Sequence, residues 1–339
     1  MVDNKYTFIY MDLDEIDLNE FNNLPDKSVL TTKEWIQFIQ QDSKAKPIII
    51  RISEANQFIG YFTGLSMVKF GFRIIGSPFP GWSTVYMGLD VIDKNKKIEI
   101  ISELIPFLYK FEKCLFIQIT DRDISTENAK NAGFRIQTIG TLELPINLDD
   151  AGLFKNMKTD CRNFIRQFER RGATLEFAIP NDEFAEEYYT QLQDVFSKQK
   201  LVPTYSLDKV KCLLKSLGAS GNILCLRVRN PEGISVATSI FPGYNKKFFF
   251  WGGASYRSAQ SYRPNEYMIY KAIQYWRDRG WEVFDMVGIR EYKKKFGSHE
   301  EYYTSIIDAK FKILFSLQEI ASRIFYLSIR IKGFMFKKR

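Results

Sequence analysis

The sequence predicts an α/β protein with mixed sheets, folded as two tandem domains of similar plan and followed by a C-terminal amphipathic helix. Strand-like segments alternate with helical segments that have one apolar face. The order of three strands, a helix and a strand occurs in each half of the chain. At 339 residues, of which 45% are hydrophobic, the chain is long enough to bury two cores.

The first half begins with a three-stranded meander. Residues 47–76 contain three β-rich segments that polar or glycine turns separate. Residues 98–113 have a helical pattern, and the apolar stretch 114–120 predicts the next strand. Residues 131–146 predict a helix end and a further strand, and a polar stretch near residue 150 predicts a domain boundary.

The second half repeats this plan. Its predicted strands lie at 222–228, 233–241, 247–253 and 282–288. The helix before the last strand begins at Pro264, where proline costs no hydrogen bond, and ends before Gly280. The apolar face of this helix is predicted to lie in the core: Met268, Ile269, Ala272, Ile273 and Trp276.

The predicted domains are residues 1–150 and 151–310, with a basic tail at 311–339. The tail mixes large apolar residues with cations such as Lys312 and Arg323. Such a helix either lies on an anionic membrane surface or caps the second domain. The acidic N-terminus has no signal sequence, and no run of 18 apolar residues occurs. We therefore expect a cytoplasmic protein, with peripheral contact to the membrane as an alternative.

The net charge of +8, from 48 basic and 40 acidic residues, favours anionic partners such as nucleic acid, nucleotide sugars or a lipid surface. The four cysteines are far apart and fit reduced thiols. With His299 as the sole histidine, no zinc site is expected, so no metal is predicted. There is no GxGxxG after a strand, P-loop, HExxH or GxSxG, and no RNP motif, and DNA is not an expected partner.

The stretch 153–172 combines an apolar helical face with a row of cations. The row consists of Lys155, Lys158, Arg162, Arg166 and Arg170. Like charges four residues apart on a helix cost about 0.2–0.5 kcal/mol per pair. The row is therefore explained by an anion that faces it, although a solvated helix face and membrane-surface docking remain alternatives.

A lysine run, Lys293–Lys295, follows the predicted strand 282–288, and ligands of open α/β sheets gather near the carboxyl ends of strands. Within that strand, Asp285 lies between apolar neighbours and must be paired or hydrogen-bonded. A structural ion pair and a general base are its two candidate roles. In the first half, Trp82 and Tyr86 belong to a loop rich in glycine and proline, which is either a turn or a wall of a substrate cleft between the domains.

Three segments resemble the Fem-type (FemAB-like) aminoacyl and acyl transferases, which belong with the wider GNAT acetyltransferase fold. They are MKTDCRNFIRQFERRGATLEF at 157–177, RDRGWEVFDMVG at 277–288 and YKKKFG at 292–297. TTKEWIQFIQ and SPFPGW also resemble the family's first domain. The resemblance spans roughly residues 30–305, and the order of its motifs is more specific than any one of them.

The resemblance implies two GNAT-like domains and the transfer of an acyl or aminoacyl group to an amine of a phosphate-bearing saccharide or cell-envelope precursor, either a small molecule or lipid-linked. The sequence offers no obvious covalent nucleophile, so we expect direct transfer without an acyl-enzyme. The resemblance also implies that Lys293, with Tyr292 and Phe296 of the same motif, lies near the reacting carbonyl, and that Lys158, Arg162 and Arg166 face phosphates of the acceptor. A membrane-surface binding or scaffold protein on a degenerate transferase fold is the alternative function.

Departures from the family pattern leave the donor open. No helical hairpin fits between Gly172 and Asn222, which counts against aminoacyl-tRNA. No glycine-rich turn precedes Pro264, which counts against ordinary acetyl-CoA binding. No basic residue closely follows Trp35, where the family has a phosphate contact. Acyl-CoA and aminoacyl-tRNA, with tRNA then a partner, both remain candidate donors.

Overall fold

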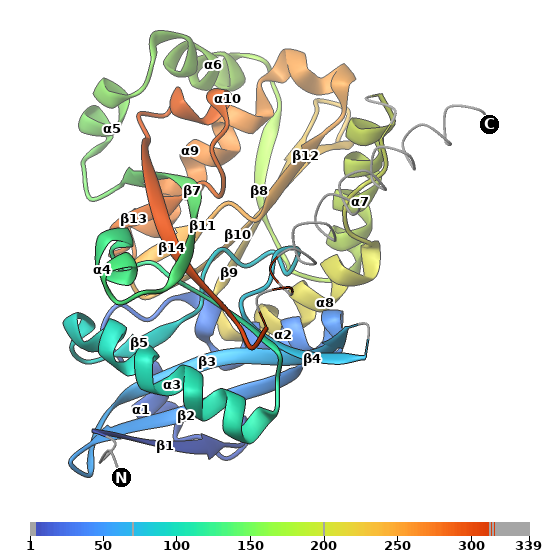
Figure 1. Ribbon diagram of the computed structural model, residues 1–339. Coiled ribbons are helices and arrows are strands. Elements are labelled where there is room, and N and C mark those ends of the chain that lie inside the picture. The colour runs from blue at the N-terminus through green and yellow to red at the C-terminus, as the bar shows by residue number, and fades with distance from the viewer. Residues whose placement is uncertain (1–4, 70, 199–200, 312, 314, 316–339) are drawn as a thin grey trace. The chain divides into compact units, whose positions relative to one another are not determined.

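The protein is described here from a computed structural model (Figure 1), which describes residues 5–69, 71–198, 201–311, 313 and 315. These residues divide into two compact units. Unit 1 comprises the residues up to Gly140 and those from Glu301 onward, and unit 2 comprises Thr141–Glu300. Each unit is an α/β structure with its own hydrophobic core. Apart from residues 311, 313 and 315, the predicted tail 311–339 lies outside the described residues.

The units differ from the predicted boundaries at 150 and 310. Unit 1 ends at Gly140, within the strand β7 (Arg135–Pro145), so the chain passes into unit 2 in the middle of an element. After Glu300 the chain returns to unit 1, because β14 (His299–Ala309) pairs with β6 (Phe116–Asp121) there. Such a return is a long-range pairing, which local pattern does not reveal.

Unit 1 contains a mixed sheet. Its order is β1-β2-β3-β4-β6-β14, with β1 (Tyr6–Met11), β2 (Lys46–Glu54), β3 (Gln57–Lys69) and β4 (Phe72–Ser77), and β5 (Leu89–Val91) pairs with β3. All pairs are antiparallel except β4 with β6. The meander predicted at 47–76 is confirmed as β2, β3 and β4.

The helices of unit 1 include the one predicted at 98–113. They are α1 (Leu18–Asn22), α2 (Lys33–Ser43), α3 (Lys97–Glu112) and α4 (Thr126–Asn131), with short 3-10 turns η1 (Val29–Thr31) and η2 (Lys94–Lys96). Ile100, Leu104 and Leu108 of α3 are fully buried, because four-residue spacing places them on one face of the helix. They lie in the same core cluster as Ile50 and Ile117 of the sheet.

Unit 2 contains a second mixed sheet. Its order is β7-β13-β11-β10-β9-β8, with β8 (Thr174–Ala178), β9 (Ile223–Arg229), β10 (Ser235–Tyr244), β11 (Lys247–Phe249) and β13 (Val283–Asp285), and β12 (Gly252–Ser255) pairs with β10. The strands predicted at 222–228 and 233–241 are confirmed as β9 and β10. The strand predicted at 247–253 is two strands, β11 and β12, with different neighbours.

The helices of unit 2 include two that the sequence analysis did not predict, and the predicted helix 153–172 is divided. The helices are α5 (Asp150–Asn156), α6 (Thr159–Arg170), α7 (Asp182–Lys198), α8 (Leu207–Leu217), α9 (Pro264–Arg277) and α10 (Glu291–Lys294), with 3-10 turns η3 (Gly218–Ser220) and η4 (Arg257–Tyr262). The two that were not predicted are α7 and α8. The segment 153–172 is not one helix, because Met157 and Lys158 have extended backbones between α5 and α6. The predicted apolar face of α9 is confirmed, since all five of its residues are buried.

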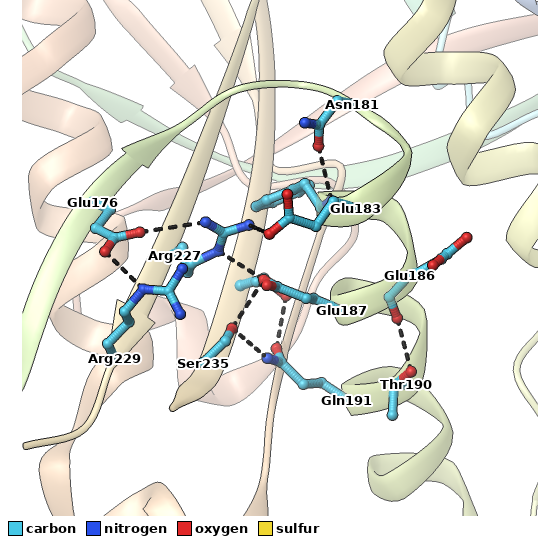
Figure 2. Close-up of polar contacts among 12 residues, drawn as sticks. Glu176, Asn181, Glu183, Glu186, Glu187, Thr190, Gln191, Arg227, Arg229 and Ser235 are labelled. Atoms are coloured by element: carbon cyan, nitrogen blue, oxygen red, sulfur yellow. Dashed lines mark hydrogen bonds and ion pairs between the residues drawn. The ribbon is translucent and has the colours of Figure 1, made fainter. Parts of the chain in front are cut away.

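A network of ion pairs joins α7 to the sheet of unit 2 (Figure 2). Arg227 of β9 donates from Nε to Glu187 of α7 at 2.7 Å, and its Nη1 lies 3.3 Å from Glu176 of β8. Ser235 of β10 donates to the same Glu187 at 3.0 Å. Arg227 is largely buried and the surrounding carboxylates satisfy its guanidinium, so the network fixes the position of α7 over these strands.

Candidate functional site

Two strands of unit 2 separate after three paired residues. β11 and β13 run parallel from Lys247 opposite Val283 to Phe249 opposite Asp285, and the N–H of Phe250 donates to the Asp285 carbonyl at 2.9 Å. Met286, the residue that follows β13, donates from its backbone N–H to the Leu142 carbonyl of β7 at 2.8 Å. β12 continues with β10 as its strand partner among the described residues. The other edge of β12 therefore offers backbone groups beside the carboxyl end of β13.

A β-bulge lies where the strands separate. Gly243 of β10 is opposite Phe248, whereas Ile240 is opposite Gly252, so three steps along β10 correspond to four along its partner. Trp251 donates from its backbone N–H to Ile240 at 3.1 Å within this irregular stretch. Bulges redirect side chains and end pairing, and they are common beside active sites.

Asp285 closes β13 and is completely buried. Its Oδ1 accepts from Thr141 Oγ1 at 2.5 Å and from the backbone N–H of Val287 at 2.8 Å. Val287 has a φ of 54°, a conformation that is strained for a β-branched residue. The carboxylate thus holds the sharp turn that leads away from the sheet.

Lys293 lies in α10 and reaches back to the same turn. Its Nζ donates to the carbonyls of Met286 at 2.5 Å and Val287 at 2.6 Å, and the side chain is buried. Burial lowers the pKa of Lys293 to about 8, and the negative charge of Asp285 opposes this shift. The amine stands 5.3 Å from the ring centre of Phe250, at the bulge. A titratable amine is therefore fixed where β11 and β13 separate.

The lysine run is neither an open loop nor a uniform patch of charge. Its first two lysines belong to α10. Lys294 pairs with Glu291 at 2.8 Å and with Glu300 at 2.9 Å. Lys295 pairs with Glu266 at 2.5 Å. Carboxylates therefore neutralise both of these charges, and Lys293 is the lysine of the run whose amine is left for chemistry at the end of β13.

The two segments that the sequence picked out, around Arg162 and around Lys293, lie together in unit 2. The backbone N–H of Lys158, at the start of α6, donates to the carbonyl of Lys295 at 2.8 Å. Phe164 of α6 contacts both Arg263, at 4.1 Å from its ring centre, and Lys295, at 5.5 Å. The start of α6 and the end of α10 thus form one surface.

The predicted anion-binding residues differ in their surroundings. Arg162 donates from Nη1 to the Phe154 carbonyl at 3.2 Å and from Nη2 to Thr159 at 3.0 Å, so it also closes the end of α5. Lys158 and Arg166 are exposed. Within the described part of the chain, neither of these two side chains forms an ion pair with a carboxylate.

Of the four remaining predicted site residues, one is exposed and three are buried. Tyr292 is 55% exposed, whereas Phe296 belongs to the core cluster of unit 2. Trp82 and Tyr86 lie in unit 1, where both are buried. Trp82 packs against Phe79, and Tyr86 accepts a hydrogen bond from Arg122 at 3.0 Å. The role of Trp82 and Tyr86 as a wall of a substrate cleft stays a prediction.

The sequence analysis missed the bulge, although a signal for it was present. Gly252 and Gly253 follow each other inside a predicted strand, which often marks a bulge or a close approach of backbones. A Cβ on Gly252 would lie 2.2 Å from the hydroxyl of Tyr188, so this position requires glycine. Near it, the indole N–H of Trp251 is buried and has no hydrogen-bond partner among the described residues.

Cys161 and Cys225, two of the four cysteines, are buried thiols. Burial raises the pKa of Cys161 to about 12 and also raises the pKa of Cys225, so both are neutral thiols at physiological pH. In the described ranges, no group of three or more His, Cys, Asp or Glu side chains is placed to bind a metal ion. No helix of the described chain has both the length and the hydropathy needed to cross a membrane.

Comparison with known proteins agrees with this geometry. Residues 155–301 match the sequence profile of the family described as acetyltransferase (GNAT) domain. No curated protein matches the chain.

Solved structures show the same fold at low sequence identity. FemX is similar with a TM-score of 0.72 at 15% identity, over 88% of this chain and 96% of that chain. A tandem GNAT protein from the clavulanic acid biosynthesis pathway is similar with a TM-score of 0.51 at 7% identity, over 90% and 98%. L-PGS from Bacillus licheniformis is similar with a TM-score of 0.50 at 13% identity, over 80% and 86%. Residues 155–301 therefore match the GNAT acetyltransferase domain, and the chain shares the fold of FemX and of tandem GNAT proteins.

Proposed function

We propose that the protein transfers an acyl or aminoacyl group directly to the amine of a saccharide or cell-envelope precursor that carries phosphate. The observation that carries this proposal is the unpaired edge of β12 beside Lys293, at the point where β11 and β13 separate. An extended donor can hydrogen-bond to such an edge as an additional strand would. Its carbonyl would then lie close to the bulge and to Lys293.

The chemistry requires no covalent intermediate with the protein. The acceptor nitrogen attacks the donor carbonyl carbon, and the carbonyl oxygen becomes negatively charged in the tetrahedral intermediate. The ammonium form of Lys293, whose third N–H is not used by Met286 or Val287, donates to that oxygen. The intermediate then expels the thiol or alcohol of the donor, which takes up the proton that the amine releases.

In this proposal Asp285 is a positioning residue. Its carboxylate already accepts from Thr141 and Val287, so it holds the turn from which two carbonyls fix Lys293. Its negative charge also favours the ammonium form of Lys293. To act as a general base, Asp285 would have to reach the acceptor amine, although its side chain is completely buried.

The acceptor's phosphates are proposed to bind to α6. Lys158 and Arg166 are exposed cations, and Arg162 stands between them along the same face. Contacts to phosphate from arginine are often bidentate and are stronger than neutral hydrogen bonds. The likeness to FemX and L-PGS supports a precursor of the cell envelope, including a lipid-linked one, as the acceptor class.

The test measures amide formation for each combination of an acyl donor and an acceptor. The purified full chain is incubated with radiolabelled acyl-CoA or aminoacyl-tRNA, each with amino sugars and their nucleotide-linked forms, and amide products are separated by mass. Transfer with one donor class is expected, and it must be lost in Lys293→Met while the melting temperature changes little. If no donor gives an amide product, or if the label is found covalently on the protein, direct transfer is rejected.

A further inference from the structure

Unit 1 contains a cavity of about 300 Å³ that the transfer chemistry does not use. Its walls come from the loop at Pro25 and Asp26, the segment from Leu89 to Asn95, the first residue of α3, and the pair Arg122 and Asp123. All of these belong to unit 1. The volume is at the lower end of the range for small-molecule pockets.

The charged residues that line this cavity are three cations, Lys94, Lys97 and Arg122, and four aspartates, Asp26, Asp90, Asp93 and Asp123. Lys97 binds Asp121 at 2.9 Å and Asp123 at 2.7 Å, and these two carboxylates hold the pKa of the buried Lys97 above its usual value although desolvation lowers it. Behind the wall, Lys27 binds Asp90 at 2.9 Å. Buried ion pairs cost desolvation and are weak contributors to stability, so their concentration beside an open volume calls for another explanation.

At the cavity wall, some donors and acceptors of these ion-paired residues have no hydrogen-bond partner among the described residues. Asp90 uses Oδ2 for Lys27, and Asp123 uses Oδ2 for Lys97, so each retains an oxygen without a hydrogen-bond partner among the described residues. Arg122 donates from Nη1 to Tyr86 and from Nη2 to the Asp26 carbonyl, which leaves three of its five N–H groups. Acceptors and donors therefore alternate around one small volume.

The charges and hydrogen-bonding groups of the cavity wall determine which class of ligand fits the cavity. The lining holds four aspartates and three cations, so its charges nearly cancel, and a free anion would be repelled by the aspartates and a free cation by Lys97 and Arg122. A hydroxyl donates to a carboxylate and accepts from a guanidinium, and so it satisfies both kinds of wall group. Leu89, Val91 and Ile92 supply an apolar side against which the C–H groups of a ring can pack.

From this geometry we infer that the unit 1 cavity is a binding site for a neutral, hydroxyl-rich ring, that is, a sugar or a closely related polyol. The site belongs to unit 1 alone and does not depend on the acyl-transfer proposal. Because the ligand is neutral, its affinity is expected to be nearly the same at low and high salt, unlike that of a phosphate.

The test uses the full chain and N-acetylglucosamine as the probe, with no acyl donor present. Saturable binding is measured by calorimetry or by ligand-observed NMR. Ile92, which lines the cavity and is 57% exposed, is replaced in Ile92→Trp, which fills part of the volume and spares the ion pairs. Ile234, 59% exposed in unit 2, provides the matched control Ile234→Trp.

Binding at least tenfold weaker in Ile92→Trp than in Ile234→Trp, with equal melting temperatures, is the expected result. Arg122→Lys should weaken binding similarly, because it keeps the charge but loses the planar fork. The inference is overturned if the sugar does not bind, if Ile92→Trp binds it as well as Ile234→Trp does, or if inorganic phosphate or glycine binds in its place. Sugar binding without any acyl transfer would reject the transferase proposal alone.

Discussion

Lys293 shows how a surface-like sequence can produce a buried functional group. Three adjacent lysines predict solvent exposure, yet Lys293 is 5% exposed and is held by two carbonyls. The adjacent lysines themselves do not distinguish it from Lys294 and Lys295, because the distinction depends on the turn carbonyls that hold Lys293 and on Glu266, which pairs with Lys295 from 29 residues away. The family resemblance identified Lys293 through its motif, and its fixed position and shifted pKa have a physical origin that only the fold supplies.

The pH dependence of transfer tests the role of Lys293. If its ammonium form stabilises the oxyanion, the contribution to kcat is complete from about one pH unit below the pKa downward, and it falls as the pH rises through the pKa of about 8. Lys293→Met should reduce kcat by about 100- to 1000-fold, the usual effect of losing an oxyanion donor. Lys293→Arg, if active, should lack the decline near pH 8, because arginine stays charged. A decline at the same pH in Lys293→Arg would assign that titration to another group.

The cations of α6 make a separate prediction about the acceptor. Arg166 is exposed and has no ion-pair partner among the described residues, so Arg166→Ala should act on a charged ligand rather than on the fold. We expect KM for a phosphate-bearing acceptor to rise roughly tenfold at low salt, with kcat nearly unchanged. Lys110→Ala, which removes one charge from the exposed surface of α3 in unit 1, is the control. Equal effects of the two changes, or an effect independent of salt, would remove Arg166 from the acceptor site.

At the scale of elements, the sequence predicted what depends on neighbours along the chain. The meanders and α9 follow from alternation, spacing and the terminal residues Pro264 and Gly280, all of which are local signals. The break between α5 and α6 was not predicted, because it depends on the hydrogen bond from Lys158 to the carbonyl of Lys295. The bulge between β11 and β12 was missed for the same reason: it is defined by the register with β10.

The junction of α5 and α10 gives a prediction on stability. Gly297 has a φ of +88°, and a Cβ there would lie 2.7 Å from the carbonyl oxygen of Asn156. Gly280 has the same φ with open space around it. Gly280→Ala should therefore cost only the strain of a left-handed backbone, about 1–2 kcal/mol. Gly297→Ala should cost about 1–3 kcal/mol more, because α5 must move away from the chain after α10. Chemical denaturation of both variants measures the difference, and equal losses would show that the contact is easily relieved.

At the scale of the whole molecule, the chain is two α/β units whose sequence is interleaved. Among the described residues, unit 1 is complete only when the chain returns to it at Glu301, after Thr141–Glu300 of unit 2. The duplicated plan was visible in the sequence because each unit's strands and helices follow one another locally. The interleaving was not, because a strand carries no mark of the distant partner with which it pairs.

Because β14 belongs to unit 1 from Glu301 onward, a substitution in that part of β14 is predicted to destabilise unit 1 rather than unit 2. Ile306 is buried in the core cluster of unit 1 and pairs with Ile119 of β6, although only a few residues separate it from the end of unit 2. Ile306→Ala should destabilise unit 1 by about 2–5 kcal/mol. Hydrogen exchange should therefore become faster in β6, while β9 and β10 keep their protection, because each unit opens as its own cooperative core. Ile313→Ala makes the same substitution at a 68% exposed site and should leave both units unchanged. If exchange in β9 and β10 rises as much as in β6, the two units unfold together, and the division drawn here has no energetic meaning.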